Sequence, residues 1–266
     1  MNPVALYFRL VRVAMQSRLQ YRADFLTGII GVIVLNVVNL GLTSILVSRF
    51  HHLNGWSLWQ MVFLYCLWIL GHSLFSLFFW HIRTLEDFLV QGTFDQFLMR
   101  PASPFVMFLG REVQYLGIAD AIFGISGISL AYANLDLHWN NLHWLLFGSA
   151  ILAGTLIETT LALMIACVSF WTGRSRRANN MVMQFNMMVQ HYPVDMFGYA
   201  FRIIVTGLIP VAFMNYYPAL TLLGKLDPQS PWGWLGYISP VVALIMVLVT
   251  TSIWHVALQH YSSSGG

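Results

Sequence analysis

The chain of 266 residues is too apolar, and carries too few charges, to be an ordinary water-soluble protein. Of its residues 58% are hydrophobic and only 9% are Asp, Glu, Lys or Arg, against about 25% charged residues in a typical soluble domain. The net charge of +3 does not indicate nucleic-acid binding, because the 13 basic residues are scattered at the ends of apolar runs. We therefore predict an all-α, polytopic membrane protein with one transmembrane domain over residues 1–266, since a helix satisfies its own backbone hydrogen bonds within lipid.

The first predicted element is an amphipathic helix over residues 3–22, within an interfacial region at 1–24. Apolar side chains lie mostly on one side of this helix, and the other side carries two arginines and two glutamines at helical spacing: Arg9, Arg12, Gln16 and Gln20. We expect the helix to rest on the inner leaflet. No small-residue cleavage signal follows the first long apolar run, so we expect no removable signal peptide.

Five long apolar runs predict membrane-spanning helices, because a helix needs about 20 mostly apolar residues to cross about 30 Å of hydrocarbon. The runs at 25–48 and 57–82 contain no Asp, Glu, Lys or Arg, and the run at 233–256 makes a clean last span. The runs at 113–133 and 144–172 also qualify, although each contains one acidic residue.

Between the second and third of these runs, residues 83–111 form a long loop, for which we predict binding to a partner protein. Acidic and apolar residues interleave through 84–99, which predicts an amphipathic helix at the membrane surface. The pair Arg100-Pro101 follows as a stop signal, because the residue before a proline disfavours helical geometry.

The acidic residues inside the predicted spans are Asp120 and Glu158, and an ionised group at such a position is costly and usually functional or paired. Glu158 lies near the middle of the fourth run and is a candidate for the translocation path or for a buried pairing, against a protonated acid that only packs. Asp120 is the weaker candidate for the path. It lies close in sequence to Arg111 and Glu112, so we expect its carboxylate to extend toward the membrane surface.

Two further apolar runs, at 178–194 and 203–224, compete for one crossing. Pro210 and Pro218 remove backbone donors from the second run, so we assign it to a re-entrant hairpin in an outer region at 195–232. This assignment gives six transmembrane helices. The alternative, seven spans with the C-terminus outside, is left open by the charges.

The basic residues orient these elements, since loops rich in Lys and Arg stay in the cytoplasm. Ten of them lie at the N-terminus, within 83–111 and at 174–177, and these regions share one side if the first four spans alternate. Of the intervening loops, one carries Arg49 and the other, at 134–143, has no Lys or Arg. We therefore predict a cytoplasmic N-terminus.

Common sequence motifs of nucleotide binding and catalysis are missing from the chain. No Gly-x-x-x-x-Gly-Lys-Ser/Thr surrounds its only lysine, Lys225, and there is no His-Glu-x-x-His, Gly-x-Ser-x-Gly or Gly-x-Gly-x-x-Gly. The histidines are scattered, and Cys66 and Cys167 lie in separate apolar runs, so we expect no metal site and no disulfide framework. We predict no catalytic residues, no ATPase site and no bound cofactor in this chain.

Three stretches of the sequence carry distinctive motifs. Residues 91–104 contain Gly-x-x-Asp-x-x-Leu-x-Arg-Pro-x-x-Pro, and residues 254–258 and 260–265 form a second motif at the C-terminus. The third combines residues of the outer region: Tyr192-Pro193, Phe197, Arg202, 209–213, 217–219 and Leu223-Gly224. Together with the order of the predicted elements, these motifs resemble ABC-2 class permeases, the membrane half of ABC exporters, and in particular a bacterial branch long known as a domain of unknown function.

The resemblance implies a permease of the bacterial inner (cytoplasmic) membrane, surrounded by lipid, that works with a separate ABC ATPase subunit. That subunit would bind ATP and Mg, and a second permease subunit, identical or divergent, would complete the transporter. Export of a substrate is implied by the resemblance alone. In the outer region the resemblance singles out Pro193, Arg202, Pro210 and Pro218.

The resemblance also suggests a hypothesis for how ATP hydrolysis is coupled to movement of the membrane helices. The helix at 84–99 docks into a groove of the ATPase, so that nucleotide-driven closure shifts the second and third spans. The alternative for its acidic residues is a solvated helix face. The candidate contact residues of this coupling helix are Glu86, Asp87, Phe88, Gln91, Phe94 and Asp95.

Two other classes of protein are alternatives. An ion-coupled secondary carrier would use Glu158 as its proton or cation site, and would transport in ATP-free vesicles under an imposed gradient. An integral membrane lipid-modifying enzyme would use Asp120, Glu158 and a histidine such as His72 or His191. It would turn over its substrate without any ATPase.

Overall fold

The computed structural model contains helices and connecting turns throughout the residues that it describes, which confirms the predicted all-α class. These residues are 3–18, 22–50, 55–99, 103–173, 175–226 and 232–261.

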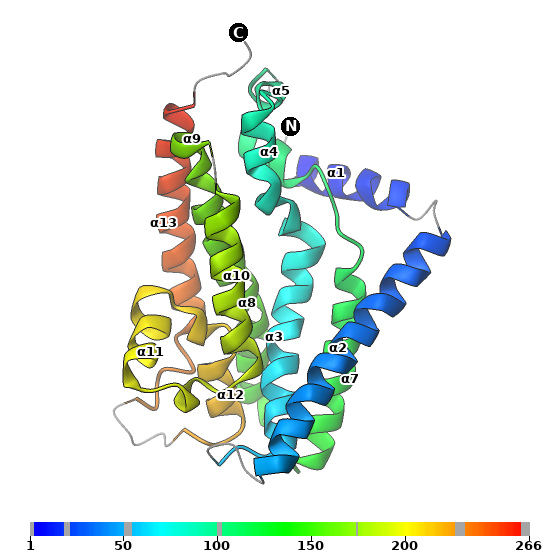
Figure 1. Ribbon diagram of the computed structural model, residues 1–266, viewed down its shortest axis with the longest axis vertical. Helices are drawn as coiled ribbons and strands as arrows, with labels where there is room; N and C mark the ends of the chain where they lie inside the picture. Colours follow the sequence, from blue (N-terminus) through cyan, green and yellow to red (C-terminus); the bar gives the residue numbers. More distant parts are fainter. Residues whose placement is uncertain are drawn as a thin grey trace.

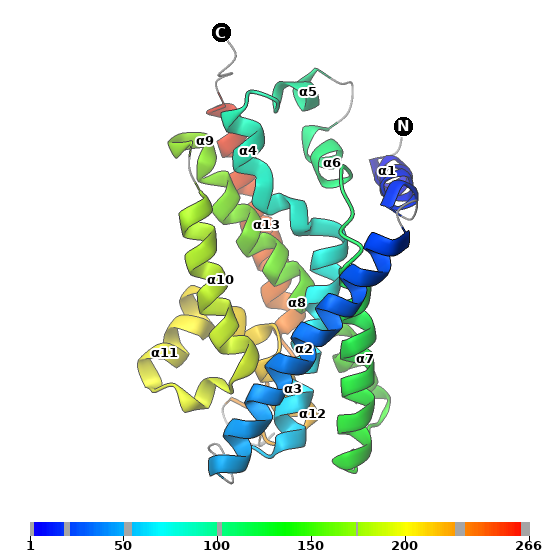
Figure 2. The same ribbon diagram turned by 45° about the vertical axis from the view of Figure 1, so that its right-hand side comes forward.

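The long helices run roughly along the longest axis of the molecule, between two ends (Figures 1 and 2). Both termini lie at the end shown at the top of Figure 1, which we call the terminal end, and α1 (Pro3–Arg18) lies there across the direction of the other helices. The long helices that lie roughly along this axis are α2 (Arg22–Phe50), α3 (Leu58–Phe79), α7 (Gly117–Asn134), α8 (Asn141–Cys167), α10 (Arg176–His191) and α13 (Ser239–Gln259).

Four helical segments of the described chain are long and apolar enough to cross a membrane: Ala23–Ile45, Leu58–Val90, Asn141–Thr172 and Ser239–Gln259. A bent pair of short helices raises this number to five if it counts as one span. The prediction of a polytopic membrane protein is therefore confirmed. The six predicted spans stay a prediction, because α7 and α10, with 18 and 16 residues, are not among these candidates.

Close backbone packing joins α3 to α7 and α8 to the segment before α12. A Cβ atom added at Gly117 would lie 2.5 Å from the backbone oxygen of Ser73, and one added at Gly154 would lie 3.0 Å from that of Met214. Small residues allow such approach, which stabilises helix pairs in lipid through van der Waals contact. The third predicted span begins later than expected, at Gly117, because the preceding turn pairs with the end of α3: the Gln114 N–H donates to the Leu77 carbonyl at 3.1 Å.

The predicted continuous helix at 84–99 is wrong. After η1 (Trp80–Thr84), the chain forms α4 (Leu85–Val90), a turn, and then the single turn of α5 (Asp95–Leu98). Gly92 in the turn has a φ of 67°, a left-handed conformation that ends a helix and that glycine adopts at little cost. The stop signal predicted at Arg100-Pro101 lies outside the described residues, and α6 (Pro104–Leu109) follows it.

After α10, the chain stays at the opposite end before α13 returns to the terminal end (Figures 1 and 2). It forms η2 (Val194–Met196), α11 (Tyr199–Ile203), the π-helical η3 (Ile204–Leu208), η4 (Val211–Phe213) and α12 (Tyr216–Leu222). The axis bends by 80° between the stretches Tyr199–Leu208 and Val211–Leu222. Pro210 lies at this bend, as expected for a residue without a backbone donor. We call the stretch from η2 to α12 the hairpin.

Candidate functional site

An aromatic cluster fixes the segment 84–99 to the rest of the terminal end. Phe94 is fully buried, and its ring centroid lies 5.6 Å from that of Phe170, 6.3 Å from that of Trp254 and 5.2 Å from that of Tyr261. Phe170 belongs to α9 (Ser169–Thr172). The cluster therefore ties the loop between α3 and α7 to the ends of α8 and α13.

Two acidic residues of this segment hold it in place within the chain. A carboxylate oxygen of Glu86 accepts hydrogen bonds from the backbone N–H of Ser175 at 2.6 Å and from its hydroxyl at 3.2 Å. The Asp95 carboxylate accepts one from the Tyr261 hydroxyl at 2.8 Å. Ser175 immediately precedes α10, so these bonds connect the segment to a long helix and to the end of α13.

The surface that the segment offers to a partner consists partly of residues that the sequence reasoning did not select. Val90 is 59% exposed and Met99 is 80% exposed, and Gln91 and Leu98 are also exposed. Of the predicted contact residues, Gln91 lies on this surface, whereas Phe88 and Asp87 are half-buried and Phe94 is interior. Composition alone does not single out Val90 and Met99, because the stretch between them also contains the apolar residues Phe94, Phe97 and Leu98.

Glu158 lies in the middle of α8, with only 2% of its surface exposed, and faces two basic side chains. Its two carboxylate oxygens lie 2.9 and 3.0 Å from Nδ1 of His72, on α3. Nη2 of Arg83, in η1, donates to Oε1 at 3.3 Å. Burial of a carboxylate is costly unless it is paired and hydrogen-bonded, and these contacts supply both. We call these three residues the Glu158 cluster.

Aromatic rings hold the basic members of this cluster in position. The Arg83 guanidinium lies 4.4 Å from the ring centroid of Trp80 and 4.9 Å from that of Phe75. The ring of His72 stacks on that of Trp68, with centroids 4.6 Å apart. Because η1 leads directly into α4, Arg83 links the acid in α8 to the segment at the terminal end.

A cavity of about 230 Å³ adjoins the Glu158 cluster. Asn186 and Gln190 of α10 line it together with Trp68 and the cluster itself. Within the described part of the chain, neither the Trp68 indole N–H nor the Asn186 side-chain oxygen has a hydrogen-bond partner. A buried donor and a buried acceptor without partners are costly, so the cavity suits a polar guest that can both accept and donate hydrogen bonds.

Asp120 does not extend to the membrane surface, contrary to the sequence interpretation. It is only 8% exposed, and its Oδ1 accepts a hydrogen bond of 2.8 Å from the side-chain amide of Asn36. The Asn36 oxygen in turn accepts one of 2.7 Å from the Tyr65 hydroxyl. The network joins α7, α2 and α3. A hydrogen-bond partner lies next to the buried carboxyl group, so the side chain does not need to extend to water.

The predicted residues of the outer region take structural positions in the hairpin. Pro193 is buried and caps η2, Pro210 lies at the bend, and Pro218 lies in the first turn of α12, where a helix needs no backbone donor. The Trp56 indole N–H donates to the carboxylate of Asp195 at 3.2 Å and so ties the hairpin to the start of α3.

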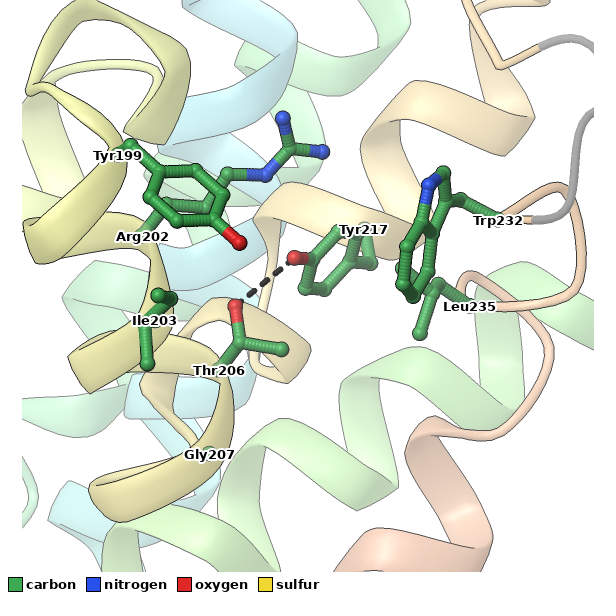
Figure 3. Close-up of a pocket in the computed structure, with 8 residues that line it drawn as sticks. All are labelled: Tyr199, Arg202, Ile203, Thr206, Gly207, Tyr217, Trp232 and Leu235. Carbon is green, nitrogen blue, oxygen red and sulfur yellow. Dashed lines mark hydrogen bonds between the residues drawn. The ribbon is translucent and has the colours of Figure 1, made fainter.

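Arg202, the charged residue among these predictions, lines a pocket of about 320 Å³ (Figure 3). Figure 3 shows Tyr199, Arg202 and Thr206 on one side of the pocket and Tyr217 and Trp232 on the other. The hydroxyl groups of Thr206 and Tyr217 are joined by a hydrogen bond of 2.8 Å across it. The hairpin thus presents one cation within a mostly apolar and aromatic wall.

Comparison with known protein families gives one match. The model of the family described as "ABC-2 family transporter protein" matches residues 33–265, which span α3 to α13 and most of α2. Searches of curated proteins and of solved structures give no match.

Proposed function

The chain belongs to the ABC-2 family of transporters, and from this premise we propose that it is the membrane-spanning permease subunit of an ATP-driven ABC exporter. A separate ATPase subunit binds ATP and Mg and supplies the energy, and the present chain provides the path for an unidentified substrate. The observation that carries the proposal is the placement of both termini, α1 and the segment 84–99 together at the terminal end (Figure 1).

In the proposed topology, this end faces the cytoplasm of a bacterial cell and six helices cross the inner membrane: α2, α3, α7, α8, α10 and α13. Termini at the same end require an even number of crossings, and the hairpin that stays at the opposite end supports its assignment as re-entrant (Figure 2). The arginine content of the N-terminus, of 83–111 and of 174–177 supports a cytoplasmic terminal end, since loops rich in Lys and Arg stay in the cytoplasm.

Energy enters through the segment 84–99, whose exposed surface around Val90, Gln91 and Met99 docks on the ATPase. Glu86 and Asp95 act from within, since their hydrogen bonds fix the segment to α10 and to the end of α13. Movement of the segment is passed to α8 through the contact between Arg83 and Glu158. In this proposal Asp87 and Phe88 support the docking surface.

The cavity beside the Glu158 cluster forms part of the substrate path. It lies between α3, α8 and α10 and has polar lining residues, and movement of the segment 84–99 can change its shape through Arg83. A second permease subunit, identical or divergent, completes the path. Almost all of α2 is exposed, so this helix offers the second subunit an apolar surface for the van der Waals packing that joins helices in lipid. Asp120 serves the packing of α2 and α7 in this arrangement.

The proposal is tested by purifying the tagged chain in mild detergent from its native membranes. We expect an ATP-binding subunit with a P-loop to co-purify, together with ATP hydrolysis that vanadate inhibits. Replacing both Val90 and Met99 with Asp is expected to reduce the recovered ATPase by at least about thirtyfold, since two buried interface contacts of about 1–3 kcal/mol each together contribute about 2 kcal/mol or more.

Tyr199→Asp is the matched control, because Tyr199 is as exposed as Met99 but belongs to α11, in the hairpin. This control is expected to retain the ATPase. Purification of the chain without any nucleotide-binding partner, combined with transport or turnover by the chain alone, contradicts the proposal and favours a carrier or a membrane enzyme.

A further inference from the structure

The pocket in the hairpin has the chemistry of a site for an anionic amphiphile. Among the described residues that line it, Arg202 is the only charged one, and the remaining walls are aromatic or apolar apart from the Thr206 hydroxyl. Figure 3 shows the hydroxyl groups of Tyr199 and Tyr217 pointing toward each other, with the Arg202 guanidinium extending along the same side. Cation and hydroxyl donors at one point are suited to a phosphate.

The charge of Arg202 is available to such a ligand. Asp195 lies near enough to attract the guanidinium, but this carboxylate also accepts the hydrogen bond from the Trp56 indole and does not line the pocket. The guanidinium also donates a hydrogen bond to the Tyr217 hydroxyl. Because a guanidinium has five N–H donors in a fixed fork, these two neighbours leave donors for a phosphate.

The walls of the pocket continue into an exposed apolar surface of the same stretch of chain. Ile203 and Leu208 are exposed side chains of α11 and η3, and Tyr199 and Trp232 are exposed at the pocket itself. Tyr and Trp at such positions are typical of the boundary between lipid headgroups and acyl chains. A ligand with its anionic group at Arg202 therefore finds space for hydrocarbon along Ile203 and Leu208.

We propose that the hairpin pocket binds an anionic phospholipid, with the phosphate at Arg202 and the acyl chains along the exposed apolar face of α11 and η3. The lipid comes from the leaflet at the opposite end, the outer one in the topology proposed above. Its chemistry matches the pocket because a net negative headgroup gains from the single cation, whereas a choline headgroup brings a positive charge to the same place.

Native mass spectrometry of the purified full-length chain tests this site. The probes are phosphatidylglycerol and phosphatidylcholine with the same acyl chains, added to the detergent-solubilised protein. We expect the wild type to bind phosphatidylglycerol about tenfold more tightly, because hydrogen bonds to charged groups are among the stronger ones in proteins. Arg202→Gln is expected to abolish this preference.

Two further variants serve as a control for Arg202→Gln and as a second test of the pocket. Arg177→Gln removes an exposed positive charge at the terminal end and is expected to preserve the preference. Trp232→Ala keeps Arg202 and removes an exposed wall of the pocket, so it reports on the site even if Arg202→Gln does not fold. It is expected to weaken phosphatidylglycerol binding by roughly tenfold, since an aromatic contact surface is lost.

Three results would overturn the proposal. The first is equal binding of the two lipids by the wild type, and the second is an unchanged preference in Arg202→Gln or unchanged binding in Trp232→Ala. The third is displacement of bound phosphatidylglycerol by millimolar inorganic phosphate, which would identify a soluble anion as the ligand. None of these results depends on the ATPase partner, so the failure of this inference leaves the proposed function untouched.

Discussion

Glu158 and Asp120 are two buried acidic residues with different surroundings. Glu158 faces the basic side chains of His72 and Arg83 and borders a cavity. Asp120 is hydrogen-bonded to the neutral amide of Asn36, in the network that joins α7 to α2 and α3. One acid thus belongs to an ion pair beside a polar space, and the other is hydrogen-bonded to neutral side chains between helices.

This difference is the basis for proposing a functional role for the carboxyl group of Glu158 and a structural role for that of Asp120. Desolvation of two charges offsets most of their attraction, so a buried ion pair is weak evidence for a stabilising role. The pair of Arg83 and Glu158 stands between the segment 84–99 and a cavity, a position that supports the transport role proposed above. The network of Asp120 joins three helices and offers no such path, which is consistent with a role in packing.

The largest effect is expected for Glu158→Leu. The substitution removes the carboxylate that faces the largely buried Arg83 guanidinium, which is expected to lower the free energy of unfolding by about 3–5 kcal/mol. Unfolding by sodium dodecyl sulfate in mixed micelles measures this change.

The double variant Arg83→Leu with Glu158→Leu is the control. Both charges are removed, so its free energy of unfolding is expected to return to within about 1–2 kcal/mol of the wild type, while ATPase-driven transport is lost. A double variant as unstable as Glu158→Leu would show that the pair is a stabilising element, and the contrast with Asp120 would fail.

A smaller effect is expected for Asp120→Leu. The side-chain amide of Asn36 loses its acceptor in a buried position, which costs about 1–3 kcal/mol of unfolding free energy. The same micelle titration detects it. A loss as large as that of Glu158→Leu would mean that Asp120 carries a charge which the fold requires.

The smallest effect is expected for Asp120→Asn. The new amide oxygen can still accept the hydrogen bond from Asn36, so the free energy of unfolding is expected to change by less than about 1 kcal/mol. Assembly with the ATPase is expected to be unchanged in a pull-down of this variant. Loss of assembly or activity with an intact fold would place Asp120 in the transport mechanism.

The long apolar helices could be predicted from the sequence because their length and lack of charge have a single physical cause, the absence of water in lipid. The runs at 25–48, 57–82 and 144–172 correspond closely to α2, α3 and α8 for this reason. The segment 84–99 could not be predicted so well. Its composition suits a helix, but the chain turns at Gly92 in a left-handed conformation, and the tertiary contacts of Phe94 and Glu86 hold the two short helices in place.

The hydrogen-bond partners of the two buried acids also could not be predicted from the sequence. Residues 72, 83 and 158 are brought together by the packing of α3 and η1 on α8. Their spacing in the sequence does not predict this contact. Asp120 was assigned to the membrane surface because Arg111 and Glu112 are its nearest charged neighbours in sequence. In space its neighbour is Asn36, a neutral residue in a run that gave no functional signal.

Photo-crosslinking from two single positions tests the central claim most directly, namely that an ATPase drives this chain from its terminal end. A photoreactive amino acid is placed in the full-length chain in native membranes, either at Met99, which follows α5 at the terminal end, or at Tyr199, the first residue of α11 in the hairpin. Both side chains are 80% exposed. The account predicts a crosslink to a P-loop ATPase from position 99 and none from position 199. A crosslink to the ATPase from position 199 alone would contradict it.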